Sequence, residues 1–218
     1  MPQAPTFAPT PAPSRDCPLC PRLAAFRAAN RIALPGWHHA PVPSWGPVDA
    51  PLLIVGLAPG LRGANRTGRP FTGDFAGKLL YATLLRHGLA SGAYAEDPMD
   101  GMQLHGVRIA NAVRCVPPQN KPDGAEIATC NRFVKAEIAA MPKLRAVLAL
   151  GGIAHAALLR ARGIVVARHK FAHGAQHELP GGLLLADSYH VSRYNTQTGR
   201  LTEAMFESAV VALLARLG

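Results

Sequence analysis

Residues 52–57 read LLIVGL, an unbroken aliphatic run that decides the fold class. A strand buried on both faces carries such a continuous run, whereas a half-exposed strand alternates apolar and polar residues. Comparable runs follow at residues 107–113 (VRIANAV), 144–150 (LRAVLAL) and 182–190 (GLLLADSYH). These four runs predict a central sheet that is mostly parallel.

Segments with helical spacing of apolar residues separate the predicted strands. They cover residues 22–32, residues 77–89, a stretch that follows Asp123, residues 151–162 and residues 201–217, where Thr202 is a candidate N-cap. Strand–helix alternation of this kind predicts an α/β fold with helices on both faces of the sheet.

The two proline-rich stretches set the predicted domain organisation. Residues 1–14 are rich in Pro, Ala and Thr and predict a disordered tail, and residues 35–51 are too dense in proline for regular structure. No linker composition appears after residue 51. We therefore expect a single domain over residues 15–218.

Composition narrows the class of function. The 218 residues include 23 Lys and Arg against 13 Asp and Glu, a formal net charge of +10, and 49% are hydrophobic, which excludes an intrinsically disordered chain. Such positive charge indicates a nucleic acid or an anionic membrane face as partner. No apolar run approaches the roughly 20 residues of a membrane span, and the N-terminus lacks a secretory signal. We expect a cytoplasmic protein.

The four cysteines have the pattern of one metal site. Cys17 and Cys20 form a CxxC pair, whose tight turn directs both sulfurs at one metal, and Cys115 and Cys130 follow. In the cytosol such thiols serve more often as metal ligands than in disulfides. The wide spacing of the second pair is not that of an ordinary zinc ribbon. Four thiolates satisfy either a [4Fe–4S] cluster or tetrahedral zinc.

The loop after the first strand reads GLAPGLRGANRTGRPFTGD, residues 56–74. Its glycines permit close approach of a ligand, but it matches neither a P-loop nor a dinucleotide-binding motif. Arg62, Arg66 and Arg69 are candidates to neutralise phosphates. Asp74 is the only carboxylate of this loop and a candidate active-site acid or base.

The histidines divide into two groups. His190 follows the last predicted strand in a polar exit loop, where acid–base chemistry is expected, since ligands bind at the carboxyl ends of parallel strands. His169, His173 and His177 are spaced four apart, but nearby glycines disfavour a helix, so we interpret them as ordinary loop histidines. His155 is likewise interpreted as an ordinary histidine without a metal-binding role.

A family resemblance emerges from these segments together. GLAPG, NRTGRPFTGD, NAVRC and SYHVSRYNTQTGRLT, with the four cysteines, resemble the uracil-DNA glycosylase superfamily, in particular its family 5 (type B), iron–sulfur enzymes of bacteria and archaea. The resemblance spans about residues 17–205. It implies a three-layer α/β/α sandwich and excision of uracil, and of other deaminated bases such as hypoxanthine, from DNA in base excision repair. It also implies a [4Fe–4S] cluster rather than zinc at Cys17, Cys20, Cys115 and Cys130.

The resemblance assigns roles to residues of the pocket. Phe71 matches the aromatic residue that stacks on the flipped base, and Asn111 matches the residue that reads the base edge. His190 matches the histidine that donates to uracil O2, where negative charge develops. Asp74 matches the aspartate that type B enzymes use at the sugar cation, in place of a carboxylate that related family 4 enzymes carry at the position of Leu57.

The remaining residues implied by the resemblance lie in the first and last motifs. Asn195 matches a further polar residue that we assign to catalysis, and the last motif reads His-Val191-Ser where the family usually has His-Pro-Ser. The other residues implied to contact substrate are Gly56, Leu57, Ala58, Ser192, Arg193 and Tyr194.

Two functional hypotheses follow. The first is a monomeric, monofunctional glycosylase acting on uracil-containing DNA, because no lysine falls in the three motif loops to act as a lyase nucleophile. The second is a metal-stabilised nucleic-acid-binding module without catalysis. The charge and the cysteines fit both, but the second leaves Asp74, Asn111 and His190 without a purpose.

Overall fold

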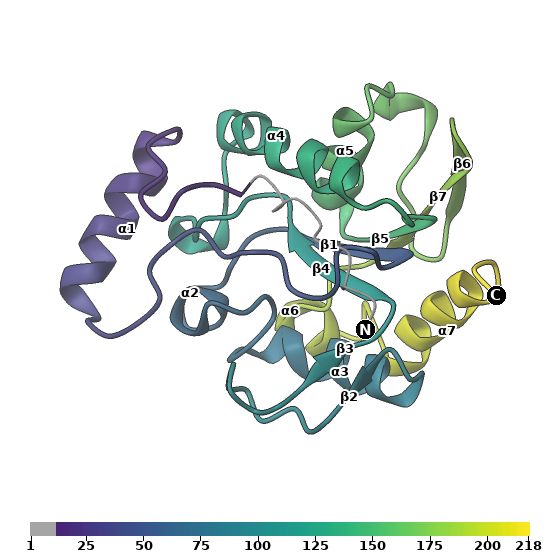
Figure 1. Cartoon of the computed structure of the whole chain (residues 1–218), viewed down its shortest axis with the longest axis horizontal. Coiled ribbons are helices and arrows are strands. Elements are labelled where there is room, and N and C mark those ends of the chain that lie inside the picture. Colours follow the sequence, from purple (N-terminus) through teal and green to yellow (C-terminus); the bar gives the residue numbers. More distant parts are fainter. Residues whose placement is uncertain (1–11) are drawn as a thin grey trace, which may run out of the picture.

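The computed structural model of the chain describes residues 12–218 (Figure 1). The predicted tail over residues 1–14 therefore falls, except for its last three residues, outside the described residues. The longer helices are α1 (Pro21–Ala33), α3 (Phe75–Arg86), α4 (Gly124–Ala140), α5 (Gly152–Ala161) and α7 (Glu203–Leu214). The short ones are α2 (Ala64–Thr67), α6 (Arg193–Gln197) and two 3₁₀ turns, η1 (Pro118–Asn120) and η2 (Val166–Arg168).

The main sheet has five strands in the order β4-β1-β5-β7-β6. The strands are β1 (Leu52–Gly56), β4 (Val107–Asn111), β5 (Ala146–Leu150), β6 (Gln176–Leu179) and β7 (Leu183–Ser188). The first four in this order are parallel, and β6 pairs antiparallel with β7. A separate small hairpin pairs β2 (Ala90–Ser91) with β3 (Gln103–Leu104). The predicted mostly parallel α/β sheet is confirmed.

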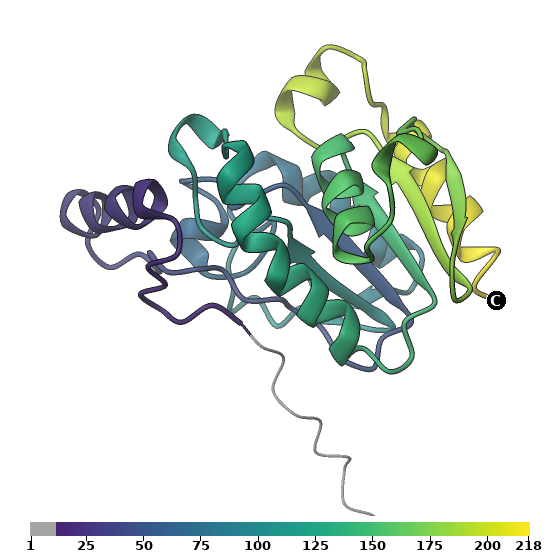
Figure 2. The same cartoon turned by 90° about the horizontal axis from the view of Figure 1, so that it is seen from above.

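Helices cover both faces of the sheet, which makes three layers. Figures 1 and 2 show α4 and α5 on one face, while α3 and α7 lie on the other. Strand β1 explains this arrangement, because successive side chains point to opposite faces. Leu52 and Ile54 pack in one apolar core with residues of α3 and α7, and Leu53 and Val55 pack in a second core with residues of α5.

Capping residues define where the helices begin. The Asp123 side chain accepts a hydrogen bond from the Glu126 N–H, and the Glu126 carboxylate accepts one from the Asp123 N–H, which forms a capping box at the start of α4. Thr202 caps α7 through the N–H of Met205, as predicted. Among residues 12–218, no helix is both long and apolar enough to cross a membrane.

Strand β6 was not predicted, and it corrects the interpretation of one histidine. Its sequence, QHEL, is short and mostly polar because it pairs on only one side, at the edge of the sheet. His177 lies in this strand, so its interpretation as a loop histidine is wrong. His169 and His173 do lie outside regular helices and strands.

Candidate active site and cysteine pocket

A pocket of about 540 Å³ opens at the carboxyl ends of the parallel strands. Segments distant in sequence meet there because parallel strands end at the same edge of the sheet. It is lined by Leu57, Ala58, Pro59, Gly60, Ala64, Phe71, Asp74, Phe75, Ala76, Asn111, Asn120, His190, Ser192, Arg193 and Tyr194. Nearly all the residues that the sequence singled out for substrate and catalysis are therefore brought together; Gly56 and Asn195 are not part of the lining.

Gly56 lies directly behind the pocket and sets its shape. It ends β1 opposite Asn111, the last residue of β4. A Cβ at residue 56 would lie 2.4 Å from Cζ of Phe71 and 2.5 Å from Oδ1 of Asn111. Only glycine lets these two side chains approach each other here. Asn111 lines the pocket, and among the described residues no group hydrogen-bonds its side-chain amide.

Phe71 has an unusual backbone. Its φ is +52°, in the left-handed region that an aromatic residue rarely adopts and that costs of order 1–3 kcal/mol. Its carbonyl accepts a hydrogen bond from the Tyr94 hydroxyl at 3.1 Å. The ring is 7% exposed, and its centroid is 6.2 Å from that of His190, with the two planes 31° apart. These contacts therefore hold the Phe71 ring, which forms part of the pocket wall, in a fixed position although its backbone is strained.

Asp74 begins α3 as its N-cap. Its Oδ1 accepts a hydrogen bond from the Ala76 N–H at 3.1 Å, which positions the carboxylate at the pocket. A Cβ at Gly60 or Gly63 would lie 2.7 or 2.1 Å from its Oδ2, so these glycines make room for the second oxygen. Burial raises the pKa of Asp74 above its ordinary value. A carboxylate of this kind has the raised basicity that proton transfer requires.

His190 lies on the loop that leaves β7. Burial lowers its pKa to about 4, so the imidazole is neutral at neutral pH and offers one N–H. Asn195 donates from Nδ2 to the carbonyl oxygen of His190 at 2.8 Å and so holds the histidine backbone from outside the pocket. Val191, at the position of the usual proline, is fully buried in the core and anchors the same loop.

The loop continues into α6, which projects from the pocket rim. Ser192 caps this helix by accepting from the Asn195 N–H at 3.3 Å. The Arg193 guanidinium lies 5.5 Å from the ring centroid of Phe75, and the Tyr194 side chain is 70% exposed. A cation and a large exposed aromatic residue at the mouth of a pocket suit contact with a large anionic ligand.

The three arginines of the first motif do not behave alike. Arg62 and Arg66 are exposed and available to phosphates, but Arg69 is buried and forms an ion pair with Asp100 at 2.7 Å. The expectation that Arg69 neutralises phosphate is therefore wrong. The spacing of arginines in a sequence does not reveal a buried partner 31 residues away.

Sequence reasoning also left several lining residues unassigned, among them Phe75 and Asn120. Phe75 directly follows the candidate residue Asp74, and this adjacency was a signal that could have identified it. Asn120 lies in the proline-dense stretch after Cys115, where it and Gln119 both have positive φ. No sequence pattern indicated that this turn reaches the pocket.

The four cysteines line a second, closed pocket, separate from the first. Cys20 directly precedes α1, Cys115 follows β4, and Cys130 lies within α4, so three segments converge there with Cys17. None of the four forms a disulfide. Leu23 and Val113 pack beside Cys115 and Cys130 in a small apolar core of their own.

The surroundings of these thiols fit metal ligation. Burial raises the pKa of Cys20 to about 11 and that of Cys115 to about 12, so without a cation these thiols stay protonated. A metal ion deprotonates its thiol ligands outright. Two donors already face the sulfurs: Arg27 Nη1 lies 3.5 Å from Cys115 Sγ, and the Arg114 N–H lies 3.3 Å from Cys130 Sγ. The donor set suits either an iron–sulfur cluster or zinc.

A third polar cluster lies away from both pockets. His155 is buried in α5 and approaches Asp187 Oδ1 with Nδ1 at 2.8 Å and the carbonyl of His169 with Nε2 at 2.9 Å. The Nε2 of His177 lies 3.3 Å from the other oxygen of Asp187. The hydrogen bond to Asp187 raises the pKa of His155 against the opposing effect of burial. Both ring nitrogens of His155 thus have partners within the protein.

Comparisons with known proteins agree with this geometry. The family model of the uracil DNA glycosylase superfamily matches residues 43–214. A type-5 uracil-DNA glycosylase of Thermus thermophilus is 48% identical over 195 residues, which cover 87% of this chain and 89% of the relative. Type-5 uracil-DNA glycosylases of Mycobacterium leprae and Pyrobaculum aerophilum are 44% and 39% identical, over 88% and 86% of this chain and 87% and 83% of the relatives.

Proposed function

The chain belongs to the uracil DNA glycosylase superfamily, and we propose that it is a monofunctional glycosylase that hydrolytically excises uracil from DNA. The observation that carries this proposal is one pocket in which a neutral histidine, an unengaged amide and a carboxylate of raised pKa converge. Recognition of a pyrimidine and cleavage of its N-glycosidic bond require groups of these three kinds. Their activity would begin base excision repair.

Recognition of the base rests on Phe71 and Asn111. A base inside a duplex is out of reach, so it must first leave the stack, at a cost of a few kcal/mol. Stacking on the Phe71 ring compensates part of that cost. The Asn111 amide supplies both a donor and an acceptor, which match uracil O4 and N3–H. Leu57 and Ala58 complete the apolar wall of the pocket.

Bond cleavage rests on His190 and Asp74. As the C1′–N1 bond breaks, its electron pair departs with uracil, and the neutral His190 donates a hydrogen bond to O2, where negative charge develops. The sugar becomes positively charged, and the Asp74 carboxylate stabilises it. Water adds its oxygen to C1′, and Asp74 accepts the proton that the water loses. Asn195 acts as a positioning residue for His190 through the carbonyl of that residue.

The flipped state is held by the loop of α6. Ser192, Arg193 and Tyr194 border the pocket mouth, and we assign Arg193 and Tyr194 to the minor groove, where inserted side chains stabilise distorted DNA. Arg62 and Arg66 are exposed, and we assign them to contacts with the phosphate backbone. The overall charge of +10 favours the same partner. We propose that the protein acts on this DNA as a monomer in the cytoplasm.

Cys17, Cys20, Cys115 and Cys130 are the proposed ligands of a [4Fe–4S] cluster. The cluster would cross-link the three segments and supplies no chemistry to the reaction, because no cysteine lines the base pocket. Protein purified without air should absorb near roughly 400 nm, as thiolate-bound iron–sulfur clusters do. A colourless protein with one equivalent of zinc would contradict the iron–sulfur assignment and leave the glycosylase assignment intact.

The range of bases is proposed to include hypoxanthine. The volume of about 540 Å³ lies within the roughly 300–1,000 Å³ usual for ligand pockets and leaves space for a purine as well as a pyrimidine. Leu57 stands at the position where related family 4 enzymes carry a carboxylate. Its aliphatic side chain neither repels a base edge nor forms a hydrogen bond to it.

The test is base release from labelled oligonucleotides that contain uracil, hypoxanthine, xanthine or a thymine mispair, followed by alkali. Strand breaks that appear only after alkali, with uracil among the substrates, are expected. Borohydride should trap no covalent adduct, because the described residues that line the pocket include no lysine. Binding to DNA without release of any base by metal-loaded protein would favour the alternative, a binding module without catalysis.

A further inference from the structure

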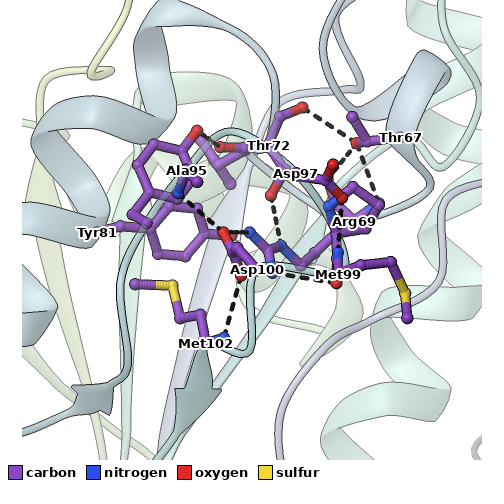
Figure 3. A network of polar contacts seen from close by, with 12 residues as sticks. Thr67, Arg69, Thr72, Tyr81, Ala95, Asp97, Met99, Asp100 and Met102 are labelled. Atoms are coloured by element: carbon purple, nitrogen blue, oxygen red, sulfur yellow. Dashed lines mark hydrogen bonds and ion pairs between the residues drawn. The ribbon is translucent and has the colours of Figure 1, made fainter.

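Arg69 and Asp100 form a buried ion pair (Figure 3). Neither residue lines the base pocket, but Phe71, two residues after Arg69, does. Both guanidinium Nη atoms lie 2.7 Å from a carboxylate oxygen, and the two side chains are 6% and 1% exposed. The guanidinium also lies 4.7 Å from the ring centroid of Trp45. Bidentate pairs of this kind fix orientation as well as distance.

The pair joins two loops that are distant in sequence. Arg69 lies between α2 and α3, and Asp100 lies in the loop between β2 and β3. The Asp100 carboxylate also accepts hydrogen bonds from the N–H groups of Ala95 and Met102, at 3.1 and 3.0 Å, so it organises its own loop (Figure 3). Arg69 holds the pKa of Asp100 at about 2, and the pair stays ionised at any working pH.

Side-chain hydrogen bonds fix the turn over residues 69–72. Arg69 Nε donates to the Thr72 hydroxyl at 2.7 Å. The Pro70 carbonyl accepts from the Tyr81 hydroxyl, and the Thr72 carbonyl accepts from the Thr67 hydroxyl at 3.1 Å. Between them lies Phe71, with its left-handed backbone.

The loop of Asp100 supplies the remaining contact. Tyr94, in that loop, donates its hydroxyl to the Phe71 carbonyl at 3.1 Å. A Cβ at Gly77 would lie 1.9 Å from that carbonyl oxygen and 2.2 Å from the hydroxyl, so α3 packs tightly under the contact. The loop that Arg69 anchors through Asp100 thus holds the peptide of Phe71 directly.

We propose that the Arg69–Asp100 pair is a positioning element for base binding: it clamps the loop over residues 92–102 onto the 69–72 turn and thereby holds the Phe71 ring in its stacking orientation. This inference rests on the proposed function. It separates binding from bond cleavage, because Asp74 is held by the Ala76 N–H and His190 by Asn195, and neither contact involves the pair.

The test uses the metal-loaded full chain, a uracil-containing duplex and single-turnover kinetics at increasing enzyme concentration. Asp100→Asn keeps the size of the side chain and removes its charge. It should raise the half-saturating enzyme concentration roughly tenfold, the scale of a lost base–aromatic stacking contact, while the maximal rate stays within about threefold. The fluorescence of 2-aminopurine placed beside the uracil should report less flipped base at a fixed enzyme concentration.

Two controls distinguish positioning from general destabilisation. Glu137→Gln removes a carboxylate from another buried cluster, with Arg108 and Arg114, and should leave half-saturation unchanged. In a Phe71→Leu background, Asp100→Asn should cause no further rise, because the pair acts through the aromatic ring. An equal rise in the Glu137→Gln variant, or an additive effect in the Phe71→Leu background, would overturn the proposal.

Tyr94→Phe covers the case in which Asp100→Asn does not fold. It deletes one hydroxyl and should raise half-saturation by a few-fold, in the same direction, whereas Tyr189→Phe, which deletes the hydroxyl of a ring that stacks on His173, should not. Unchanged half-saturation in Tyr94→Phe and in any folded Asp100→Asn protein would refute the inference while wild-type uracil release still supports the proposed function. A wild-type protein that releases no uracil would instead refute the function itself.

Discussion

The base pocket and the cysteine pocket lie on either side of one short segment, yet they are constructed in opposite ways. Asn111 faces the first pocket, and Cys115, four residues later, faces the second. The base pocket is open, and its polar groups carry unmatched hydrogen-bonding capacity or a raised pKa. The cysteine pocket is closed, apolar and lined by thiols from three segments. The first is suited to a ligand that enters and leaves, and the second to one that stays.

Asp74→Asn should separate the two regions most strongly. Loss of the carboxylate should lower the single-turnover rate by roughly 10²- to 10⁴-fold, with DNA binding retained. The thermal midpoint should stay the same or rise, because Asn caps a helix as well as Asp and carries no buried charge. Asp123→Asn, at the exposed cap of α4, is the matched control and should change neither quantity. An unchanged rate in Asp74→Asn would mean that another group stabilises the sugar cation.

His190→Ala should have the next largest effect, a loss of roughly 10²- to 10³-fold in rate, as for other donors aimed at developing charge. Because the histidine is neutral, the loss should be the same throughout the neutral pH range. The measurement is the single-turnover rate on a uracil duplex at saturating enzyme. A loss that disappears on a substrate with a better leaving group would sharpen the assignment, and an equal loss on both would contradict it.

The pH dependence should follow Asp74 rather than His190. Because burial raises the pKa of Asp74, the acid limb of the pH–rate profile should lie at higher pH than the pKa of an ordinary aspartate. Below the pKa of Asp74 the rate should fall about tenfold per pH unit. His190, with a pKa of about 4, stays neutral over this limb. Stability has the opposite sign: protonation of Asp74 favours the folded state, so its contribution grows as pH falls through the folded pKa. If the acid limb of the pH–rate profile shifts in the His190→Asn variant, the assignment of this limb to Asp74 is refuted.

Cys130→Ala should have the smallest effect on rate and the clearest effect on stability. The chromophore should disappear, and the thermal midpoint should fall by roughly 10 °C, since each of the several kcal/mol lost shifts it by about 2–4 °C in a chain of this size. The folded fraction should cleave within about tenfold of the wild-type rate. Asp74→Asn, which should keep its colour, is the reciprocal control. A colourless variant with an unchanged midpoint would refute a structural role for the cysteine pocket.

The sequence was most informative where a single segment carries its own signal. The apolar run at 52–57 predicts a buried strand because both of its faces must be covered, and Asp123 and Thr202 predict helix starts because a cap acts within three residues. Edge strand β6 was missed because it is mostly polar and pairs on only one side.

The site was predictable where motifs carry it and unpredictable where burial decides. The resemblance pointed to the positions that line the pocket, but it could not reveal that Asn195 lies outside the lining and hydrogen-bonds the His190 carbonyl, or that Asn120 lies in the lining. Arg69 looked like a phosphate ligand because its ion pair with Asp100 exists only in three dimensions. The raised pKa of Asp74 is likewise a property of its surroundings rather than of its neighbours in the sequence.

The glycine behind the pocket limits how this protein can evolve. Gly56, Phe71 and Asn111 come from three separate segments but compete for one volume, since a single methyl group at residue 56 would collide with both of the other side chains. A larger residue at position 56 therefore requires Phe71 and Asn111 to give way as well. Directed evolution that aims to fill this part of the pocket from β1 would have to vary the three codons together.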